Sequence, residues 1–502
     1  MSIWYSNSSV GPSRAVPKLT FAAKLLVVAA AVLVWLSTPG IAEVRLPNIF
    51  GTHMVLQRDS AVRVWGWADP GEPVKVTLAG AVGGTRADDE GHWQVELPGL
   101  PAGGPYAMTV TGGNMIRLED VLVGEVWLCS GQSNMWRPLY WPQRNWGVVD
   151  YDREIAAADL PRLRFLNLSR VPGGEHPNPP KAAPAENAVG SWRRCSPKTA
   201  ASFSATAQFF GRVLLAELDV PVGLINASYG GSKIEAWIPP EGFRSVAELQ
   251  GLADQAEARC PDANVTHHCP SSLFNSMIHP LLPLQLRGFL WYQGESNVSD
   301  GPRYAAKMEA LIRGWRDLWG GEDVPFYYVQ LPPFRYGGNV HRLALLREAQ
   351  AAALALPHTG MVVTLDVGDL NDIHPQQKKP VGHRLALLAL ANDYGRDTLT
   401  HTGPVFRSMR IEGPRVYIEF DHVASGLMSC DGKPLKGFEI AGADGRFVAA
   451  EATIDGSRLV LHHRSVTTPT AARFAWHQEA QPNLINSAGL PAAPFRIGVQ
   501  EE

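Results

Sequence analysis

The sequence predicts an α/β protein whose central domain has a mainly parallel sheet covered by helices, with a β-sandwich domain on each side. Three observations predict this arrangement. Apolar residues alternate with period two through residues 43–120, apolar strands alternate with amphipathic helices through 121–396, and the alternation returns in 397–502. A chain of 502 residues with 45% hydrophobic content is long enough for two or three packed domains.

Residues 1–42 have the features of a cleaved export signal. Arg14, Lys18 and Lys24 precede an apolar run of about a dozen residues, and Ala42 closes a stretch of small residues. This run is shorter than the ~20 residues that span a bilayer, so we expect cleavage after Ala42 rather than an uncleaved anchor. The mature protein is then periplasmic or secreted, without integral membrane association.

Residues 43–120 are predicted to form a small β-sandwich of jelly-roll type. Val74, Val76 and Leu78 alternate with other residues, as in antiparallel strands that bury one face. Turn signals such as Asp69-Pro70-Gly71 separate these runs at short intervals, which favours a sandwich.

Residues 121–396 are predicted to form the α/β domain. Met308, Leu311, Ile312 and Trp315 recur at helical spacing between apolar runs that have the length of buried strands. In a parallel sheet built this way, ligands bind beyond the carboxyl ends of the strands. The predicted strands are Val121–Leu128, Leu163–Leu168, Val222–Ala227, Gly288–Tyr292, Phe326–Leu331 and Met361–Leu365.

Residues 397–502 return to the β pattern. Val416, Ile418 and Phe420 alternate, and Asp444-Gly445 marks a hairpin turn. A second β-sandwich is therefore expected to close the chain.

The charge of the chain indicates the class of ligand, and its cysteine content indicates which covalent links and metal sites to expect. The net charge of −3, with no long run of one sign, gives no footprint for nucleic acid or an anionic membrane, so we expect a neutral small molecule or polysaccharide. The five cysteines are an odd number, so at least one thiol is free or pairs with another chain, and Cys260 and Cys269 are close enough for a local disulfide. His267 and His268 beside Cys269 lack a second ligand pair at zinc-like spacing, and no metal or other cofactor is expected.

The first candidate for chemistry is Ser133, in a Gly-Gln-Ser-Asn-Met segment directly after a predicted strand. A serine at a strand-to-helix turn exposes its hydroxyl, and its backbone N–H lies near a helix N-terminus that stabilises negative charge. Such a serine can act as a nucleophile with a built-in oxyanion donor. The alternative is that Ser133 only caps the following helix.

The second candidate is the segment Asp372-Ile373-His374-Pro375 after the last predicted strand. A neutral histidine can take the serine proton if its other nitrogen is held, and a nearby carboxylate such as Asp372 does this. The alternative is a capping Asp beside a surface histidine.

Two further segments follow strands. Gln293 could donate its amide to an oxyanion, whereas Glu295 is either an acid/base group or a buried acceptor that fixes its loop, and we favour the latter. Gly230 and Gly231 could supply a second oxyanion N–H, although paired glycines also form ordinary turns.

These motifs, in this order, resemble the sialate O-acetylesterase family within the SGNH (GDSL-like) hydrolases. The resemblance runs through Gly124-Glu125-Val126-Trp127, the Ser133 segment, Tyr229-Gly230-Gly231-Ser232, Trp291-Tyr292-Gln293-Gly294-Glu295-Ser296 and Asp372-Ile373-His374-Pro375, and it includes the leading β domain. It implies an SGNH-type three-layer α/β/α domain. It also implies an acetylesterase in which Ser133 attacks the acetyl carbonyl and His374 is the base.

The oxyanion donors that the resemblance implies are the backbone of Ser133, a glycine of the Gly230-Gly231 pair and Gln293. The acid member departs from the wider superfamily, whose Asp lies three residues before His, where this chain has Asn371. Asp372 is the favoured acid; Asp369, a backbone carbonyl or a bare Ser–His dyad are the alternatives.

The expected substrate is an acetylated oligo- or polysaccharide, either a plant cell-wall glycan such as xyloglucan or xylan, or an O-acetylated sialic acid. Trp136, Tyr140, Trp141 and Trp146 follow Ser133 and either stack on sugar rings or belong to the core. A non-catalytic glycan-binding protein on a decayed hydrolase core is the competing hypothesis. A lipase or peptidase would need an apolar acyl pocket or a peptide groove, and the sequence indicates neither.

Overall fold

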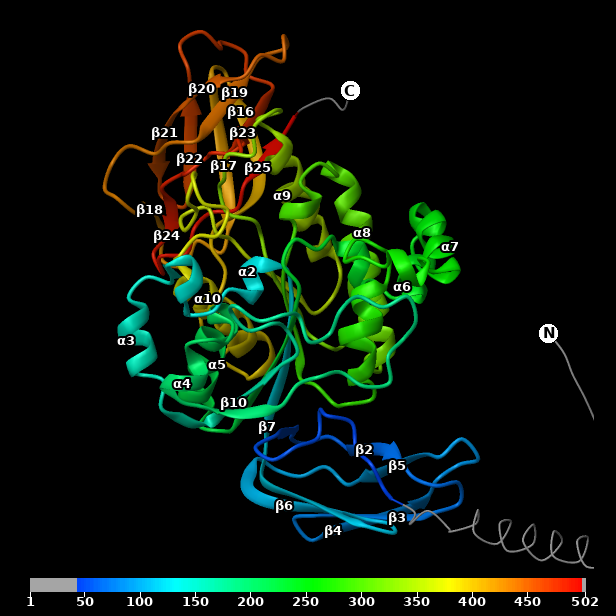
Figure 1. Ribbon diagram of the computed structural model, residues 1–502. Coiled ribbons are helices and arrows are strands. Elements are labelled where there is room, and N and C mark those ends of the chain that lie inside the picture. The colour runs from blue at the N-terminus through cyan, green and yellow to red at the C-terminus, as the bar shows by residue number, and fades with distance from the viewer. Residues whose placement is uncertain (1–42, 499–502) are drawn as a thin grey trace, which may run out of the picture.

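One long strand, β7 (Met115–Gly131), belongs both to the N-terminal β domain and to the central sheet. The computed structural model describes residues 43–498 and shows β7 rising from the lower β domain into the α/β core (Figure 1). The boundary predicted after residue 120 therefore falls within a strand. The predicted export signal, residues 1–42, lies outside the described residues.

The N-terminal domain consists of two facing layers of strands. In the larger layer β3 pairs with β4 and β6, and β6 and β1 pair with β7; in the smaller layer β2 pairs with β5. The layers approach closely, because a Cβ added to Gly83 of β4 would lie 2.6 Å from Val95 of β5. The predicted sandwich is confirmed, with strands β1 (Val55–Gln57), β2 (Val62–Trp67), β3 (Pro73–Leu78), β4 (Ala81–Arg86), β5 (His92–Leu97) and β6 (Gly103–Thr111).

The central sheet has the order β11-β10-β12-β7-β13-β14-β15. All six predicted strands are present and parallel, and β11, at the edge, is an antiparallel strand that the sequence did not predict. Every residue of β12 and β13 is buried, as expected for strands with helices on both faces. The strands are β10 (Leu160–Asn167), β11 (Trp192–Cys195), β12 (Val222–Ser228), β13 (Gly288–Tyr292), β14 (Phe326–Val329) and β15 (Thr359–Val362).

Helices cover both faces of this sheet. Helices α5 and α10 pack together on one face, and α6, α8 and α9 lie on the other (Figure 1). The predicted three-layer α/β/α core is thus confirmed. The helices are α3 (Tyr151–Ala156), α4 (Pro197–Ala200), α5 (Ala205–Leu218), α6 (Pro240–Arg244), α7 (Gln250–Ala258), α8 (Tyr304–Trp319), α9 (Arg342–Ala352) and α10 (Lys378–Asp393).

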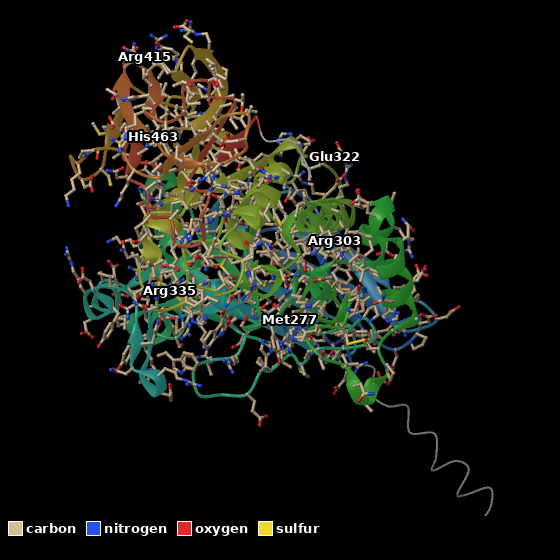
Figure 2. All side chains as sticks on the ribbon, turned by 90° about the horizontal axis from the view of Figure 1, so that it is seen from above. Met277, Arg303, Glu322, Arg335, Arg415 and His463 are labelled. Carbon is tan, nitrogen blue, oxygen red and sulfur yellow. A yellow bond between two sulfur atoms is a disulfide. The ribbon has the colours of Figure 1, made fainter. Side chains whose placement is uncertain are left out.

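The C-terminal domain has two four-stranded antiparallel sheets, β16-β17-β22-β21 and β20-β19-β23-β25, and a β18-β24 pair. Phe495 joins the two sheets, because its ring lies 4.8 Å from that of Phe406 and 5.9 Å from that of Phe474. Seen from above, the region around Arg415 and His463 lies to one side of the core (Figure 2). The strands are β16 (Val405–Glu412), β17 (Arg415–Asp421), β18 (Leu427–Ser429), β19 (Phe438–Ala441), β20 (Val448–Ala449), β21 (Glu451–Asp455), β22 (Arg458–His462), β23 (Ala471–Phe474), β24 (Leu484–Asn486) and β25 (Phe495–Ile497).

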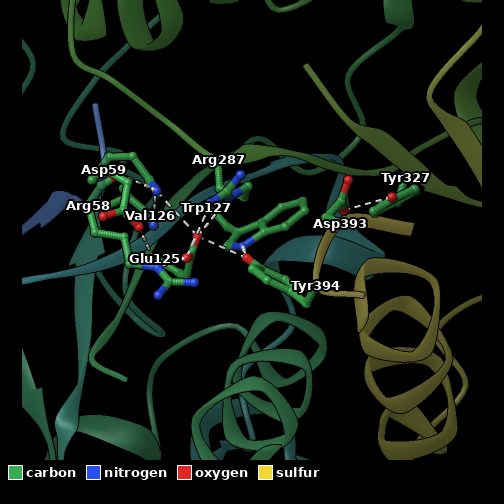
Figure 3. A network of polar contacts seen from close by, with 10 residues as sticks. Arg58, Asp59, Glu125, Val126, Trp127, Arg287, Tyr327, Asp393 and Tyr394 are labelled. Atoms are coloured by element: carbon green, nitrogen blue, oxygen red, sulfur yellow. Dashed lines mark hydrogen bonds and ion pairs between the residues drawn. The ribbon is translucent and has the colours of Figure 1, made fainter. Parts of the chain in front are cut away.

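A buried carboxylate on β7, Glu125, ties the N-terminal domain to the core (Figure 3). It forms ion pairs with Arg58, which follows β1, and with Arg287, which precedes β13, and it accepts a hydrogen bond of 2.9 Å from the hydroxyl of Tyr394. Burial alone would raise the pKa of Glu125, but hydrogen bonds and charges from Arg287 and Arg58 outweigh it and hold the pKa below its usual value. The carboxylate therefore stays ionised and fully partnered.

Cys260 and Cys269 form the local disulfide that the sequence allowed (Figure 2). Cys129 and Cys195 are buried thiols, and Cys430 is an exposed one. Within residues 43–498, none of the helices has the length and apolar character needed to cross a bilayer.

Candidate active site

The carboxyl ends of three neighbouring strands bring the sequence motifs together. Gly131, the last residue of β7, lies opposite Ser228 of β12 and Tyr292 of β13. The chain beyond β7 is held to the same neighbours, since Tyr229 N–H donates to the Gly131 carbonyl and Gln132 N–H donates to the Tyr292 carbonyl, both at 3.0 Å.

Ser133 is the first residue of the short helix α2 (Ser133–Trp136). The turn before it requires glycine, because Gly131 has φ 133° and an added Cβ would lie 2.2 Å from the Tyr292 carbonyl oxygen. The helix cap is Gln132, so Ser133 is not the capping residue that the alternative hypothesis required. As the first residue of a helix, Ser133 has a backbone N–H without an intrahelical acceptor.

His374 faces Ser133 from the loop after β15. Its Nε2 lies 3.0 Å from the Ser133 Oγ. Two contacts fix this loop: the Trp146 indole N–H donates to the His374 carbonyl at 3.3 Å, and the Asn134 amide donates to the Ile373 carbonyl at 3.0 Å. Because α10 begins only at Lys378, the histidine is not part of a helix cap.

Two groups of opposite charge lie near the other ring nitrogen of His374. The Arg137 guanidinium lies 2.9 Å from Nδ1, and the Asp372 Oδ1 lies 3.3 Å from it. The same Asp372 oxygen accepts from the His374 backbone N–H at 2.9 Å, and 42% of the Asp372 side chain is exposed. Burial, followed by the charges of Arg137 and Lys378, lowers the pKa of His374 to about 4 against the opposing effect of Asp372.

The two glycines lie on the opposite side of Ser133. A Cβ added to Gly230 would lie 3.7 Å from the Ser133 Cβ, so the Gly230 backbone passes close to the nucleophile and leaves room for about one side-chain atom between them. The N–H of Gly230 has no hydrogen-bond acceptor among residues 43–498. Gly231 has a left-handed φ of 77°, and its carbonyl accepts from the Ser296 hydroxyl at 2.9 Å.

Gln293 does not fit the role of oxyanion donor. It is completely buried, and its amide N–H groups donate to the Ser232 carbonyl at 3.1 Å and to Asn297 Oδ1 at 2.7 Å. The hydroxyl of Tyr304 donates to the side-chain Oε1 of Gln293 at 2.7 Å. With both donors engaged, Gln293 holds the loop after β13 together.

Gln132 is the glutamine that lines the cavity at Ser133. Its Oε1 is 3.4 Å from the backbone N–H groups of both Gly294 and Ser296, which orients the amide, and its Nε2 has no acceptor at the β13 loop. Gln132 belongs to the serine motif of the sequence, but the motif alone predicted no role for it. Its position directly before the nucleophile was the available signal.

Glu295 belongs to a buried polar chain behind Ser133. Its Oε1 accepts from the side-chain amide Nδ2 of Asn134, and the side-chain Oδ1 of Asn134 accepts from the Lys378 ammonium. Burial raises the pKa of Glu295 and lowers that of Lys378 to about 7. This arrangement agrees with the favoured structural role of Glu295 as a buried acceptor, although the residue also borders the cavity.

A cavity of about 640 Å³ opens over Ser133 and His374. Among the aromatic residues after Ser133, Trp136, Trp141 and Trp146 line it, whereas Tyr140 stacks on Tyr151 with ring centroids 4.4 Å apart. Three arginines also line it: Arg137, Arg144 and Arg170. Among residues 43–498, none of the three forms an ion pair with a carboxylate within 4.0 Å.

The predicted neutral ligand therefore does not match the local charge of this cavity. The net charge of −3 is a sum over the whole chain and conceals three unneutralised guanidinium groups around one serine. His267, considered above beside Cys269, stacks between Tyr229 and His268, and no group of three or more His, Cys, Asp or Glu side chains in residues 43–498 is placed to hold a metal ion.

Comparison with known proteins agrees with the resemblance in the motifs. Residues 123–391, more than half of the chain, match the family described as carbohydrate esterase, sialic acid-specific acetylesterase. The sialate O-acetylesterase of Homo sapiens is 30% identical over 495 residues, covering 90% of this chain and 92% of that protein, and that of Mus musculus is 28% identical over 519 residues, covering 90% and 94%. The crystal structure of a carbohydrate acetylesterase from Xanthomonas citri is 38% identical, with a TM-score of 0.81 over 90% of this chain and 99% of that chain. The chain therefore belongs to the sialic acid-specific acetylesterase family of carbohydrate esterases and is a carboxylic ester hydrolase that removes O-acetyl groups from sugars.

Proposed function

We propose that this reaction proceeds through an acetyl-enzyme on Ser133, with His374 as general base and acid. The observation that carries the proposal is the 3.0 Å distance between the Ser133 Oγ and the His374 Nε2. His374 takes the hydroxyl proton as Oγ attacks the acetyl carbonyl, and it returns the proton to the departing sugar oxygen. A water molecule, deprotonated by His374, then attacks the acetyl-enzyme and releases acetate.

The negative charge on the acetyl oxygen needs donors that are already in place. We propose the backbone N–H groups of Ser133 and Gly230 together with the side-chain amide of Gln132, which replaces Gln293 in this role. The free amide of Gly230 beside Ser133 and the orienting contacts on Gln132 support this set.

The charge of the cavity favours an anionic sugar over a neutral glycan. Arg144 and Arg170 are exposed guanidinium groups beside Trp141, with their central carbons 5.6 and 5.7 Å from its ring centroid. A planar guanidinium binds a carboxylate through two parallel hydrogen bonds, and a tryptophan face accepts the apolar face of a sugar ring. We therefore propose that the acetylated sugar carries a carboxylate, as an O-acetylated sialic acid does, whereas xyloglucan and xylan backbones do not.

The test of the mechanism is acetate release by wild type, Ser133→Ala and His374→Ala. Each substitution is expected to lower kcat by at least about 10⁴-fold while the melting temperature stays near that of wild type. Full activity of Ser133→Ala would overturn the assignment of the nucleophile. Absence of acetate release by wild type on every acetyl ester would favour the alternative glycan-binding protein.

The test of the substrate compares O-acetylated sialic acid with acetylated xyloglucan and acetylated xylan. Wild type is expected to prefer the sialic acid, and Arg170→Met is expected to reduce kcat/KM for it by about tenfold while affecting the neutral glycans little. Equal losses on all three substrates would indicate that Arg170 has a structural role. A preference for a neutral glycan would overturn the proposed substrate class.

We also propose that the protein is exported. The basic residues and apolar run of residues 1–42 support removal of this segment. N-terminal sequencing of the protein recovered from outside the cytoplasm is expected to begin at Glu43.

A further inference from the structure

The contact between Arg137 and His374 favours one of the two neutral tautomers of the histidine, whereas Asp372, 3.3 Å from the same Nδ1, favours the other. A guanidinium has only N–H donors, so the Nδ1 atom 2.9 Å from Arg137 Nη2 must offer its lone pair. In a neutral imidazole the proton then resides on Nε2, where it points at the Ser133 Oγ. A histidine in this tautomer cannot accept the serine proton, because Nε2 has no free lone pair.

Asp372 is placed to stabilise the other neutral tautomer, in which Nδ1 carries the proton. Its Oδ1 lies 3.3 Å from Nδ1 but is bound at present to the His374 backbone N–H at 2.9 Å. If Arg137 moved away, a proton on Nδ1 would face this carboxylate, and Nε2 would face Ser133 with its lone pair.

Arg137 is placed to meet the substrate. Its guanidinium lines the cavity and lies 4.9 and 4.8 Å from the ring centroids of Trp141 and Trp146. Its buried Nε has no hydrogen-bond partner among the described residues, and no carboxylate in residues 43–498 lies within 4.0 Å of the guanidinium, although the charge of Asp372 acts on it. An imidazole nitrogen is a weaker acceptor for a guanidinium than a carboxylate, which offers two charged oxygens.

We propose that Arg137 is a latch that holds His374 in the inactive tautomer until an oxygen-rich, anionic group of the sugar draws the guanidinium away. When Arg137 turns to the substrate, Nδ1 takes a proton from solvent beside Asp372, and the imidazolium formed in this way then loses its Nε2 proton to solvent. The ring is neutral before and after this exchange. Arg137 is thus a positioning residue that couples sugar binding to activation of the base. This inference rests on the proposed Ser133–His374 mechanism.

The latch is tested first by locating the proton. Solid-state ¹⁵N NMR of histidine-labelled protein, with His374→Ala to identify the signal, is expected to show His374 protonated at Nε2 in the free wild type. Addition of a deacetylated sialic acid is expected to move the proton to Nδ1. Arg137→Met, which keeps an apolar stem between the tryptophans, is expected to show Nδ1 protonated without any ligand. Arg162→Met, the control, removes an exposed arginine that pairs with Asp219 and does not line the cavity, and it is expected to leave the proton on Nε2.

Kinetic measurements on two esters distinguish the proposed role of Arg137 from a purely structural role. p-Nitrophenyl acetate carries no sugar to draw Arg137 away, so Arg137→Met is expected to raise kcat/KM for it by about tenfold and to lower kcat/KM for O-acetylated sialic acid by a similar factor. Arg162→Met is expected to leave both rates unchanged. Protonation of Nδ1 in free wild type, or an equal loss on both esters in Arg137→Met, would overturn the latch. If Arg137→Met fails to fold, the ligand titration of wild type decides the question alone. Full turnover by His374→Ala would instead overturn the proposed mechanism, and the proton could still be located.

Discussion

The part of β7 that belongs to the central sheet runs from Glu125, its lower end, to Gly131, its upper end, and these two ends handle buried charge in opposite ways. At the lower end Glu125 is completely buried, and two guanidinium groups and a tyrosine hydroxyl satisfy it (Figure 3). Just beyond the upper end, Arg137 has no carboxylate partner within ion-pair distance among residues 43–498, and the Oε2 atom of buried Glu295 has no hydrogen-bond partner there.

This difference separates a structural charge from a functional one. A buried ion with all its partners is costly to disturb and gives a ligand nothing to bind. A charge without an ion-pair partner beside a nucleophile remains available to interact with the substrate and its transition state. The predictions below test whether stability depends on the lower end and activity on the upper end.

The largest expected effect is a loss of stability in Glu125→Gln. The neutral amide leaves Arg58 and Arg287 without a counter-charge. We therefore expect the free energy of unfolding of the part that contains β7 to fall by about 3 kcal/mol. Activity per folded molecule should not change, because Glu125 lies where β7 enters the central sheet, whereas Ser133 follows the carboxyl end of the strand. Calorimetry and acetate release measure the two effects.

The matched control is Glu119→Gln on the same strand. Glu119 is exposed and pairs with Arg117, and exposed pairs contribute about 0–1 kcal/mol. If Glu125→Gln were no more destabilising than Glu119→Gln, the contrast between the two ends of β7 would disappear.

The second prediction concerns pH. His374 must be neutral to act as a base, and its pKa of about 4 means that it becomes charged only below that pH. We therefore expect kcat/KM to persist as pH falls from 7 to 5 and to halve near pH 4. Because its pKa is below the usual value, Glu125 keeps its charge to a lower pH than an ordinary glutamate does, which favours retention of its ion pairs at the lower end.

Removing one cation sharpens this prediction. In Arg137→Met the midpoint of the acid limb should rise toward the ordinary histidine pKa of about 6.5, because a charge next to the ring is lost. Far-UV circular dichroism at each pH separates titration from unfolding. A wild-type midpoint near 6.5 would contradict the effect of burial, Arg137 and Lys378 on His374.

The sequence predicted the architecture because strong local patterns encode it. Buried parallel strands are continuous apolar runs, so all six were found, and the motifs at their carboxyl ends had to meet at one edge. The edge strand β11 was missed because its sequence, Trp-Arg-Arg-Cys, has neither an apolar run nor strict alternation.

The details of the site depend on partners that are distant in the sequence. Gln293 and Gln132 are equally plausible amide donors by sequence, and only the packing of Ser232, Asn297 and Tyr304 around Gln293 removes its donors. Arg137 carries no local signal, because its contact lies 237 residues away at His374. The cationic cavity was missed as well, since Arg170 follows β10 and joins Arg137 and Arg144, which follow Ser133, only in the folded chain.

The smallest expected effect is that of Asp372→Asn. A fully buried triad aspartate contributes about 10⁴-fold to kcat, but Asp372 is 42% exposed and water can partly replace its charge. Asparagine also keeps an oxygen that can accept from Nδ1, so the active tautomer remains accessible. We expect kcat to fall by about tenfold for O-acetylated sialic acid. Asp369→Asn is the control, because the contacts of Asp369 Oδ1 within residues 43–498 are with the backbone N–H groups of Asn371 and Asp372. A 10⁴-fold loss in Asp372→Asn would indicate a complete triad, no loss would indicate a bare dyad, and a loss confined to Asp369→Asn would transfer the acid role to that residue.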